Sequence, residues 1–221
     1  MAKKTNMDLV VHAQSKLGVH YLYGAKGQNV TASQIKLWGK LYPKYYGNQR
    51  IDKALNWIGQ PATDCSGLIS WLTGIEKSSS TYYSSAAEKG TIKTIPEILG
   101  LAVWKQGHIG IYIGSGQVIE ARGFDYGVVQ TKLQSRPWTH WLKLSDINYD
   151  HIPKSVTRQS SKQDIIWLQS ILNIKMNAKL TLDGIYGTKT ANAYKEYARS
   201  HGWQKPDGWS VGSNGIKSLA K

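Results

Sequence analysis

The chain has 221 residues, of which 41% are hydrophobic, so it is long enough for two compact units and can fill a core. Its formal net charge is +14, which favours a polyanionic partner: nucleic acid, an anionic membrane or an anionic wall polymer. The basic residues are spread along the chain, which argues against a localised nucleic-acid footprint. The single cysteine excludes an intramolecular disulfide and a cysteine-rich zinc site.

The amino end carries the charge of a signal peptide at Lys3 and Lys4, but it lacks the apolar core that must follow. Asp8, His12 and Lys16 interrupt that stretch. Nowhere does the chain approach the roughly 18–20 apolar residues that a membrane span needs. We therefore expect a protein without a signal peptide or a membrane span, made in a cytoplasm.

The order of the predicted elements is helices first and strands second. Apolar residues recur at helical spacing over 8–17, and residues 26–60 are rich in loops with short helical patches at 35–41 and 51–58. A further helix is predicted from Asp64 through Leu72, ended by Gly74. Strands are predicted at 102–105, 108–114, 117–121 and 128–133, separated by glycine-containing turns. This pattern indicates an α+β domain with an antiparallel sheet.

The polar stretch around 153–162 is expected to be a linker between domains at 1–152 and 163–221. Beyond it, helical spacing returns, and two Asp-Gly turns at 183–184 and 207–208 each precede a helical segment. The two similar halves predict a small three-helix module.

The only thiol, Cys65, lies at the start of a predicted helix, between Asp64 and Ser66. At that place the helix dipole and the free N–H groups are expected to lower the pKa of the thiol. His108 opens a predicted strand and can accept the proton of the thiol. Glu120, on the next strand of a hairpin, is expected to lie opposite the region of His108 and to orient its ring.

Each of these residues also has an ordinary structural interpretation. A lone cysteine is more often a buried core residue, although the polar neighbours of Cys65 argue against that here. His108 can be a solvated histidine, and Glu120 can be a solvent-facing residue on an edge strand.

Four ordered motifs resemble the NlpC/P60 cysteine peptidases over about residues 8–150. They are Gly18–Gly24, Thr63–Ile69, His108–Gly114 and Val118–Ala121. The resemblance implies a papain-like fold and hydrolysis of the bond between D-γ-glutamate and the diamino acid of bacterial peptidoglycan, without a metal or cofactor. It implies Cys65 as nucleophile, His108 as base and Glu120 as the third catalytic residue. Tyr21, Asp64 and Ser66 resemble the residues that line the pocket for the amino end of the stem peptide.

The sequence departs from the family pattern at two places. The third catalytic residue of the family is usually His and sometimes Asn or Gln, so we interpret Glu120 as a functional substitution that holds the imidazolium more strongly. Nearly forty residues separate Gly24 from Asp64, where many members have about ten. This insert, 26–60, either borders the cleft and shapes substrate choice or packs on itself as a surface elaboration.

The carboxy-terminal part resembles a peptidoglycan-binding type 1 domain over 163–203. The matching residues include Trp167–Gln169, Asp183–Gly187, Thr190 and Tyr194. Tyr186, Trp203 and Trp209 are the expected stacking residues of its binding surface. With a catalytic domain first and a wall-binding domain second, the chain resembles a bacteriophage endolysin. Such a protein is made in the host cytoplasm and acts on the cell wall after release.

Two alternatives stay open. The first is an N-acetylmuramoyl-L-alanine amidase, which cleaves a different bond, because related papain-like domains have that activity. The second is a catalytically inactive scaffold that only binds the wall. The sequence does not distinguish Lys from diaminopimelate in the stem peptide, and nucleic-acid binding ranks last because no recognition motif accompanies the charge.

Overall fold

A computed structural model of the chain describes residues 3–204 and 206–221. It divides into two compact units, Met1–Asn148 and Tyr149–Lys221. Within the described ranges, no helix has the length and apolar character needed to cross a membrane.

The first unit is built on a six-stranded sheet in the order β5-β10-β6-β7-β8-β9, with every neighbouring pair antiparallel. The predicted strands correspond to β6 (Ala102–Lys105), β7 (His108–Gly114), β8 (Gln117–Gly123) and β9 (Gly127–Lys132). The α+β class and the antiparallel sheet are therefore confirmed. The other two strands, β5 (Glu88–Thr91) and β10 (His140–Lys143), were not predicted, because each is short and flanked by irregular segments.

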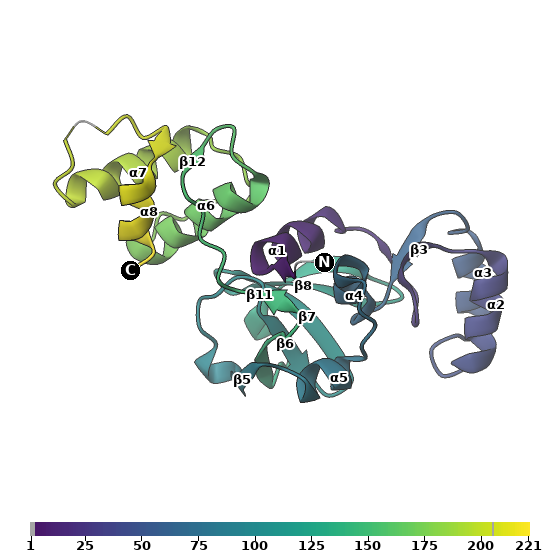
Figure 1. Ribbon diagram of the computed structural model, residues 1–221. Helices are drawn as coiled ribbons and strands as arrows, with labels where there is room; N and C mark the ends of the chain where they lie inside the picture. The colour runs from purple at the N-terminus through teal and green to yellow at the C-terminus, as the bar shows by residue number, and fades with distance from the viewer. Residues whose placement is uncertain (1–2, 205) are drawn as a thin grey trace. The chain divides into compact units, whose positions relative to one another are not determined.

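The first helix, α1 (Asn6–Ser15), lies against β7, β8 and α4 (Gly67–Thr73) (Figure 1). Thr5 and Asp8 form a reciprocal capping box at its start, which satisfies two N–H groups that a helix end leaves free. Its apolar side packs into the core, and every residue of β7 is buried. The start of the chain also pairs with the end of the unit, through β1 (Lys4–Thr5) and the parallel strand β11 (Ile147–Asn148).

Helix α4 follows the predicted limits closely. It ends at Gly74, which adopts the left-handed conformation (φ 70°) that glycine accepts most readily. At its first residue, Gly67, a β-carbon would collide with the carbonyl oxygen of Ala25 and come within 2.9 Å of Thr63 Oγ1. A glycine at this position therefore allows the helix to start close to the neighbouring chain.

The insert and the segments on either side of it form a small structure beside this helix. The strands β2 (His20–Tyr21), β4 (Pro61–Thr63) and β3 (Lys26–Asn29) form a three-stranded sheet in that order, and α2 (Ala32–Leu41) and α3 (Asn48–Leu55) pack together (Figure 1). Its buried residues form one apolar cluster: Leu22, Ala25, Val30, Ile35, Trp38, Tyr46, Ala54 and Ala62.

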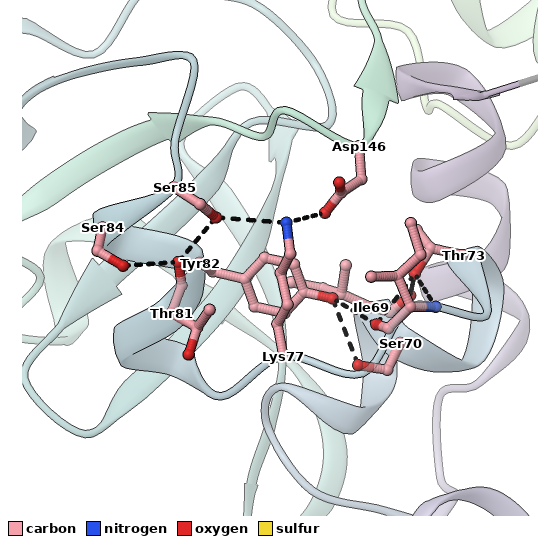
Figure 2. Close-up of polar contacts among 10 residues, drawn as sticks. Ile69, Ser70, Thr73, Lys77, Thr81, Tyr82, Ser84, Ser85 and Asp146 are labelled. Carbon is pink, nitrogen blue, oxygen red and sulfur yellow. Dashed lines mark hydrogen bonds and ion pairs between the residues drawn. The ribbon is translucent and has the colours of Figure 1, made fainter.

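A largely buried ion pair joins the segment after α4 to the segment before β11. Lys77 Nζ lies 2.5 Å from Asp146 Oδ2 and 3.3 Å from Ser85 Oγ, beside the ring of Tyr82 (Figure 2). The hydroxyl of Tyr82, on α5 (Ser79–Ser84), also contacts Ser70 Oγ at 3.3 Å. These contacts tie α4 and the segment after it to α5 and to the segment before β11.

Asp146→Asn is expected to lower the free energy of unfolding by about 3 kcal/mol, because it leaves the Lys77 ammonium without its carboxylate in a site only 16% exposed. Chemical denaturation followed by tryptophan fluorescence measures this. The control is Glu76→Gln, which breaks an exposed ion pair of similar length with Lys26 and is expected to cost less than about 1 kcal/mol. Equal effects of the two substitutions would contradict the prediction.

The second unit has three helices in its described part: α6 (Lys162–Met176), α7 (Thr188–Ser200) and α8 (Ser213–Leu219). Residues 153–162, expected as a linker, belong to this unit and contain β12 (Val156–Thr157), which pairs with β13 (Ser210–Val211). Val156 is fully buried, because the strand pair brings it into the core of the unit.

The two predicted Asp-Gly turns have the same local geometry. Asp183 Oδ1 accepts a hydrogen bond from Ile185 N at 2.9 Å, and Asp207 Oδ1 accepts one from Trp209 N at 2.8 Å. The glycine between each pair has a positive φ, 71° at Gly184 and 82° at Gly208. The internal similarity of the sequence is thus visible as two aspartate-stabilised turns of the same kind.

Candidate active site

Cys65 lies just before α4, between the insert and the sheet. The residue is 8% exposed. The backbone N–H groups of Ile109, on β7, and of Ser66 lie near the thiol and favour its charged form. Because Ile109 follows His108 directly, the thiol lies near the backbone at the start of β7, the strand that carries His108.

The electrostatic state of the thiol differs from the prediction. Burial, together with the neighbouring Asp64 carboxylate, raises the pKa of the Cys65 thiol to about 12, although the backbone N–H groups act to lower it. The expected lowering of this pKa is therefore wrong. The physical reason is that desolvation of a thiolate at this depth outweighs the backbone dipoles that a short helix start provides.

His108 and Glu120 form a buried pair. His108 Nε2 lies 2.7 Å from Glu120 Oε2, and the carboxylate side chain is fully buried. The strand register explains the contact: Ile111 pairs with Ile119, so Glu120 lies opposite Gly110, two residues from His108. With Nε2 engaged by Glu120, Nδ1 is the ring nitrogen left to exchange a proton with a nucleophile.

Two residues not identified from the sequence hold the other oxygen of Glu120. Thr131 Oγ1 donates a hydrogen bond to Glu120 Oε1 at 2.8 Å, and Arg136 Nε lies 3.1 Å from the same oxygen. Burial alone would raise the pKa of Glu120, but the hydrogen bonds from His108 and Thr131 and the charges of His108 and Arg136 hold it below its ordinary value. Glu120 is thus an ionised carboxylate at neutral pH.

Trp138 is the third residue that sequence reasoning missed. Its ring stacks on the imidazole of His108, with centroids 5.4 Å apart and planes within 9°. The ring comes so close to β7 that a β-carbon on Gly110 would lie 3.2 Å from it and 3.3 Å from the β-carbon of Glu120. Gly110 therefore leaves the space in which Trp138 and Glu120 confine the imidazole.

The three residues predicted to line a substrate pocket lie beside the thiol. Asp64 Oδ2 accepts a hydrogen bond from Gly24 N at 2.9 Å, and its Oδ1 accepts from Gly67 N at 2.7 Å and from Ser66 Oγ at 3.1 Å. Burial raises the pKa of Tyr21, and the nearby Cys65 and Asp64 raise it further. Tyr21 is therefore a neutral hydrogen-bond donor near Cys65, and Asp64 mainly fixes the start of α4.

Alkylation of Cys65 by iodoacetamide is expected to become faster with every increase in pH between about pH 6 and pH 10, without a plateau, because only the thiolate reacts. A pKa near 12 in place of the ordinary 9 leaves about a thousandfold less thiolate at neutral pH. The chain has one cysteine, so mass spectrometry reports this site alone. Denatured protein, the control, is expected to react faster, whereas a plateau near neutral pH in folded protein would contradict the prediction.

A cavity of about 280 Å³ lies where the insert faces the β8–β9 hairpin. It is bordered by Tyr21 and, from the insert side, by aromatic residues and Arg50; the hairpin contributes Arg122 to Tyr126. The insert thus packs around an apolar cluster that it shares with its flanking segments, and it borders a cavity lined by Tyr21, which also lies near the thiol.

The expected wall-binding residues are distributed over the second unit. Tyr186 is only 5% exposed, and its hydroxyl donates to the carbonyl of Gly208 at 2.8 Å, so it is mainly a core residue. Trp209 is half-buried, with the Arg158 guanidinium 3.4 Å above its ring. Trp203 is half-buried too and lies against Tyr194 and Tyr197.

The chain matches no protein-family model and no curated protein. Among solved structures it is similar to NlpC2 from Trichomonas vaginalis, with 16% identity and a TM-score of 0.40 over 66% of this chain and 49% of that one. It is also similar to the peptidoglycan hydrolase RipB from Mycobacterium tuberculosis, with 20% identity and a TM-score of 0.43 over 65% of this chain and 66% of that one. A third similar structure is the P60 domain of an antigen from M. avium subspecies paratuberculosis, with 18% identity and a TM-score of 0.43 over 65% of this chain and 96% of that one. The chain therefore spans about half the length of NlpC2 and 66% of RipB.

Proposed function

We propose that this chain is a peptidoglycan hydrolase that uses Cys65 as nucleophile, His108 as general base and Glu120 as the residue that orients the base. The observation that carries the proposal is the buried His108–Glu120 pair at 2.7 Å, on a strand whose next residue, Ile109, lies near the Cys65 thiol. A carboxylate, an imidazole and a nucleophile in this order form the arrangement that cleaves acyl bonds. The bond proposed is that between D-γ-glutamate and the diamino acid of the stem peptide.

Because the Cys65 thiol is protonated, its attack on the substrate must be coupled to loss of the thiol proton. The sulfur attacks the scissile carbonyl carbon while its proton passes to Nδ1 of His108, so the thiolate need not exist beforehand. Glu120 stabilises the resulting imidazolium through Nε2. The imidazolium then gives its proton to the leaving amine, and water releases the acyl group from the sulfur with His108 again as base.

The second unit is proposed to hold the enzyme on the wall. Its support is a shallow depression of about 450 Å³ that contains Trp209, Arg158 and the 65%-exposed Ile185. An aromatic face beside a cation suits a sugar or peptide with anionic groups. The net charge of +14 supports retention by anionic wall polymers. An endolysin-like role, with synthesis in a host cytoplasm and action after release, is part of this proposal.

Turbidity of purified Gram-positive cell walls tests the proposal. Wild-type protein is expected to lower the turbidity, whereas Cys65→Ala and Cys65→Ser proteins are expected to sediment with the walls and leave the turbidity unchanged. Lysis by the Cys65→Ala protein would contradict the assignment of Cys65 as the nucleophile. Binding without lysis by the wild type would instead favour an inactive wall-binding scaffold.

A further inference from the structure

The cavity between the insert and the β8–β9 hairpin is a candidate binding site that the proposed catalytic residues do not use. Its volume, about 280 Å³, suits one or two functional groups of a ligand. Aromatic side chains make up most of its lining, namely Tyr21, Tyr23, Tyr45, Tyr46, Phe124 and Tyr126. Three charged residues also line the cavity: Arg50, Arg122 and Asp125.

The wall on the insert side is held in place by its own contacts. Tyr23 and Tyr45 stack with their ring centroids 3.8 Å apart and their planes within 4°. Tyr46 donates a hydrogen bond from its hydroxyl to the carbonyl of Tyr23 at 2.8 Å. Arg50, on α3, donates to the carbonyl of Tyr45 at 3.3 Å. These contacts preorganise the wall before any ligand arrives.

The charge of the cavity is positive. Asp125 is its one acidic lining residue, and it already faces Arg50 at 3.7 Å and Lys53 at 4.0 Å. Arg122 lies over the ring of Tyr126 at 4.0 Å, and in the described part of the chain no carboxylate forms an ion pair with it. A half-buried guanidinium fixed on an aromatic face is well suited to bind a carboxylate through two N–H groups.

The cavity is adjacent to the reacting centre. Arg122 is two residues beyond Glu120 on β8, and Tyr21 is shared by the cavity lining and the surroundings of Cys65. A group bound there would belong to the same ligand as the bond under attack. A γ-linked glutamyl residue leaves its α-carboxylate free next to that bond.

We propose that this cavity binds a free carboxylate next to the scissile bond, with Arg122 as its main ligand, and so makes the enzyme selective for the acid over the amide form of the substrate. This inference rests on the proposed hydrolase function. It assigns the insert a part in specificity, because Tyr45, Tyr46 and Arg50 of the insert line the same cavity as Arg122.

The test compares the peptide L-Ala-γ-D-Glu-L-Lys-D-Ala with its counterpart that carries D-isoglutamine in place of D-Glu. Wild-type protein is expected to cleave the acid form with a kcat/KM about tenfold higher or more. Arg122→Gln is expected to remove that preference by lowering kcat/KM for the acid form alone, and Arg122→Lys is expected to restore part of it. The control, Lys132→Gln, removes a charge from an exposed position on the adjacent strand β9 and is expected to change neither rate.

Equal cleavage of both peptides by the wild type, or an equal loss on both in Arg122→Gln, would overturn the carboxylate site and leave the hydrolase function standing. If the wild type cleaves neither these peptides nor their diaminopimelate counterparts, the proposed endopeptidase function fails. Calorimetric binding of the two peptides to Cys65→Ala protein then decides the inference by itself. Tighter binding of the acid form that is lost with Arg122→Gln supports the inference, and no difference between the peptides overturns it.

Discussion

Glu120→Gln protein is expected to lose about 10²–10⁴-fold in kcat/KM toward peptidoglycan peptides while it remains folded. Glutamine can still contact His108 Nε2, but it carries no charge to stabilise the imidazolium that forms when the thiol loses its proton. Glu120→Ala is expected to lose as much activity and also about 3 kcal/mol of unfolding free energy, because Arg136 and Thr131 then face an empty buried site. Steady-state kinetics and denaturation measure the two effects separately.

Glu97→Gln is the matched control. Glu97 accepts hydrogen bonds from the Tyr112 hydroxyl at 2.6 Å and from Ser115 N at 2.6 Å, at the far end of the same hairpin. Its replacement is expected to leave kcat/KM within about twofold, because it has no contact with His108. Wild-type activity in Glu120→Gln protein would show that the carboxylate only fills space.

The second large effect is expected from Gly67→Ala. This substitution is expected to abolish activity and to lower the free energy of unfolding by about 1–3 kcal/mol. The new methyl group would collide with the Ala25 carbonyl and approach Thr63 Oγ1 and Asp64 Oδ1, at 2.9 and 3.1 Å. To relieve this, the start of α4 must move away from the β3 side, and Cys65 must move with it. Lysis assays and thermal denaturation test the two consequences.

The control is Gly47→Ala, at the N-cap of α3 in the same unit. Its φ is −85°, and no atom lies within 4 Å of the added β-carbon. It is expected to cost about 1 kcal/mol or less, through the weaker helix cap alone, and to leave lysis unchanged. An active Gly67→Ala protein would show that the helix start is more tolerant than its packing indicates.

The strands that carry the site were predictable because their apolar residues are bounded by glycine turns. His108–Gly114 was predicted with both limits correct, and the hairpin that follows brings Glu120 within two residues of His108. The end of α4 was predictable because Gly74 alone suits its left-handed position. By contrast, β5 and β10 pair residues about fifty positions apart, and neither strand has a local pattern that reveals it.

The surroundings of the His108–Glu120 pair were only partly predictable. Thr131 follows the alternation of a strand next to Glu120, so it could have been found from the register of β8 and β9. Arg136 and Trp138 reach the site from the segment after β9. No periodic pattern in the sequence predicts the path of such an irregular segment. The pKa of Cys65 was predicted with the wrong sign, because the depth of burial of a thiol depends on tertiary packing.

Mass spectrometry of peptidoglycan digested by the wild-type and Cys65→Ala proteins tests the central claim most directly. The wild type is expected to release fragments with a new amino-terminal diamino acid, and the Cys65→Ala protein is expected to release none. Fragments with a free lactyl carboxylate and a free L-Ala amine would identify an amidase instead. The same fragments from both proteins, or none from the wild type, would contradict hydrolysis of peptidoglycan by Cys65.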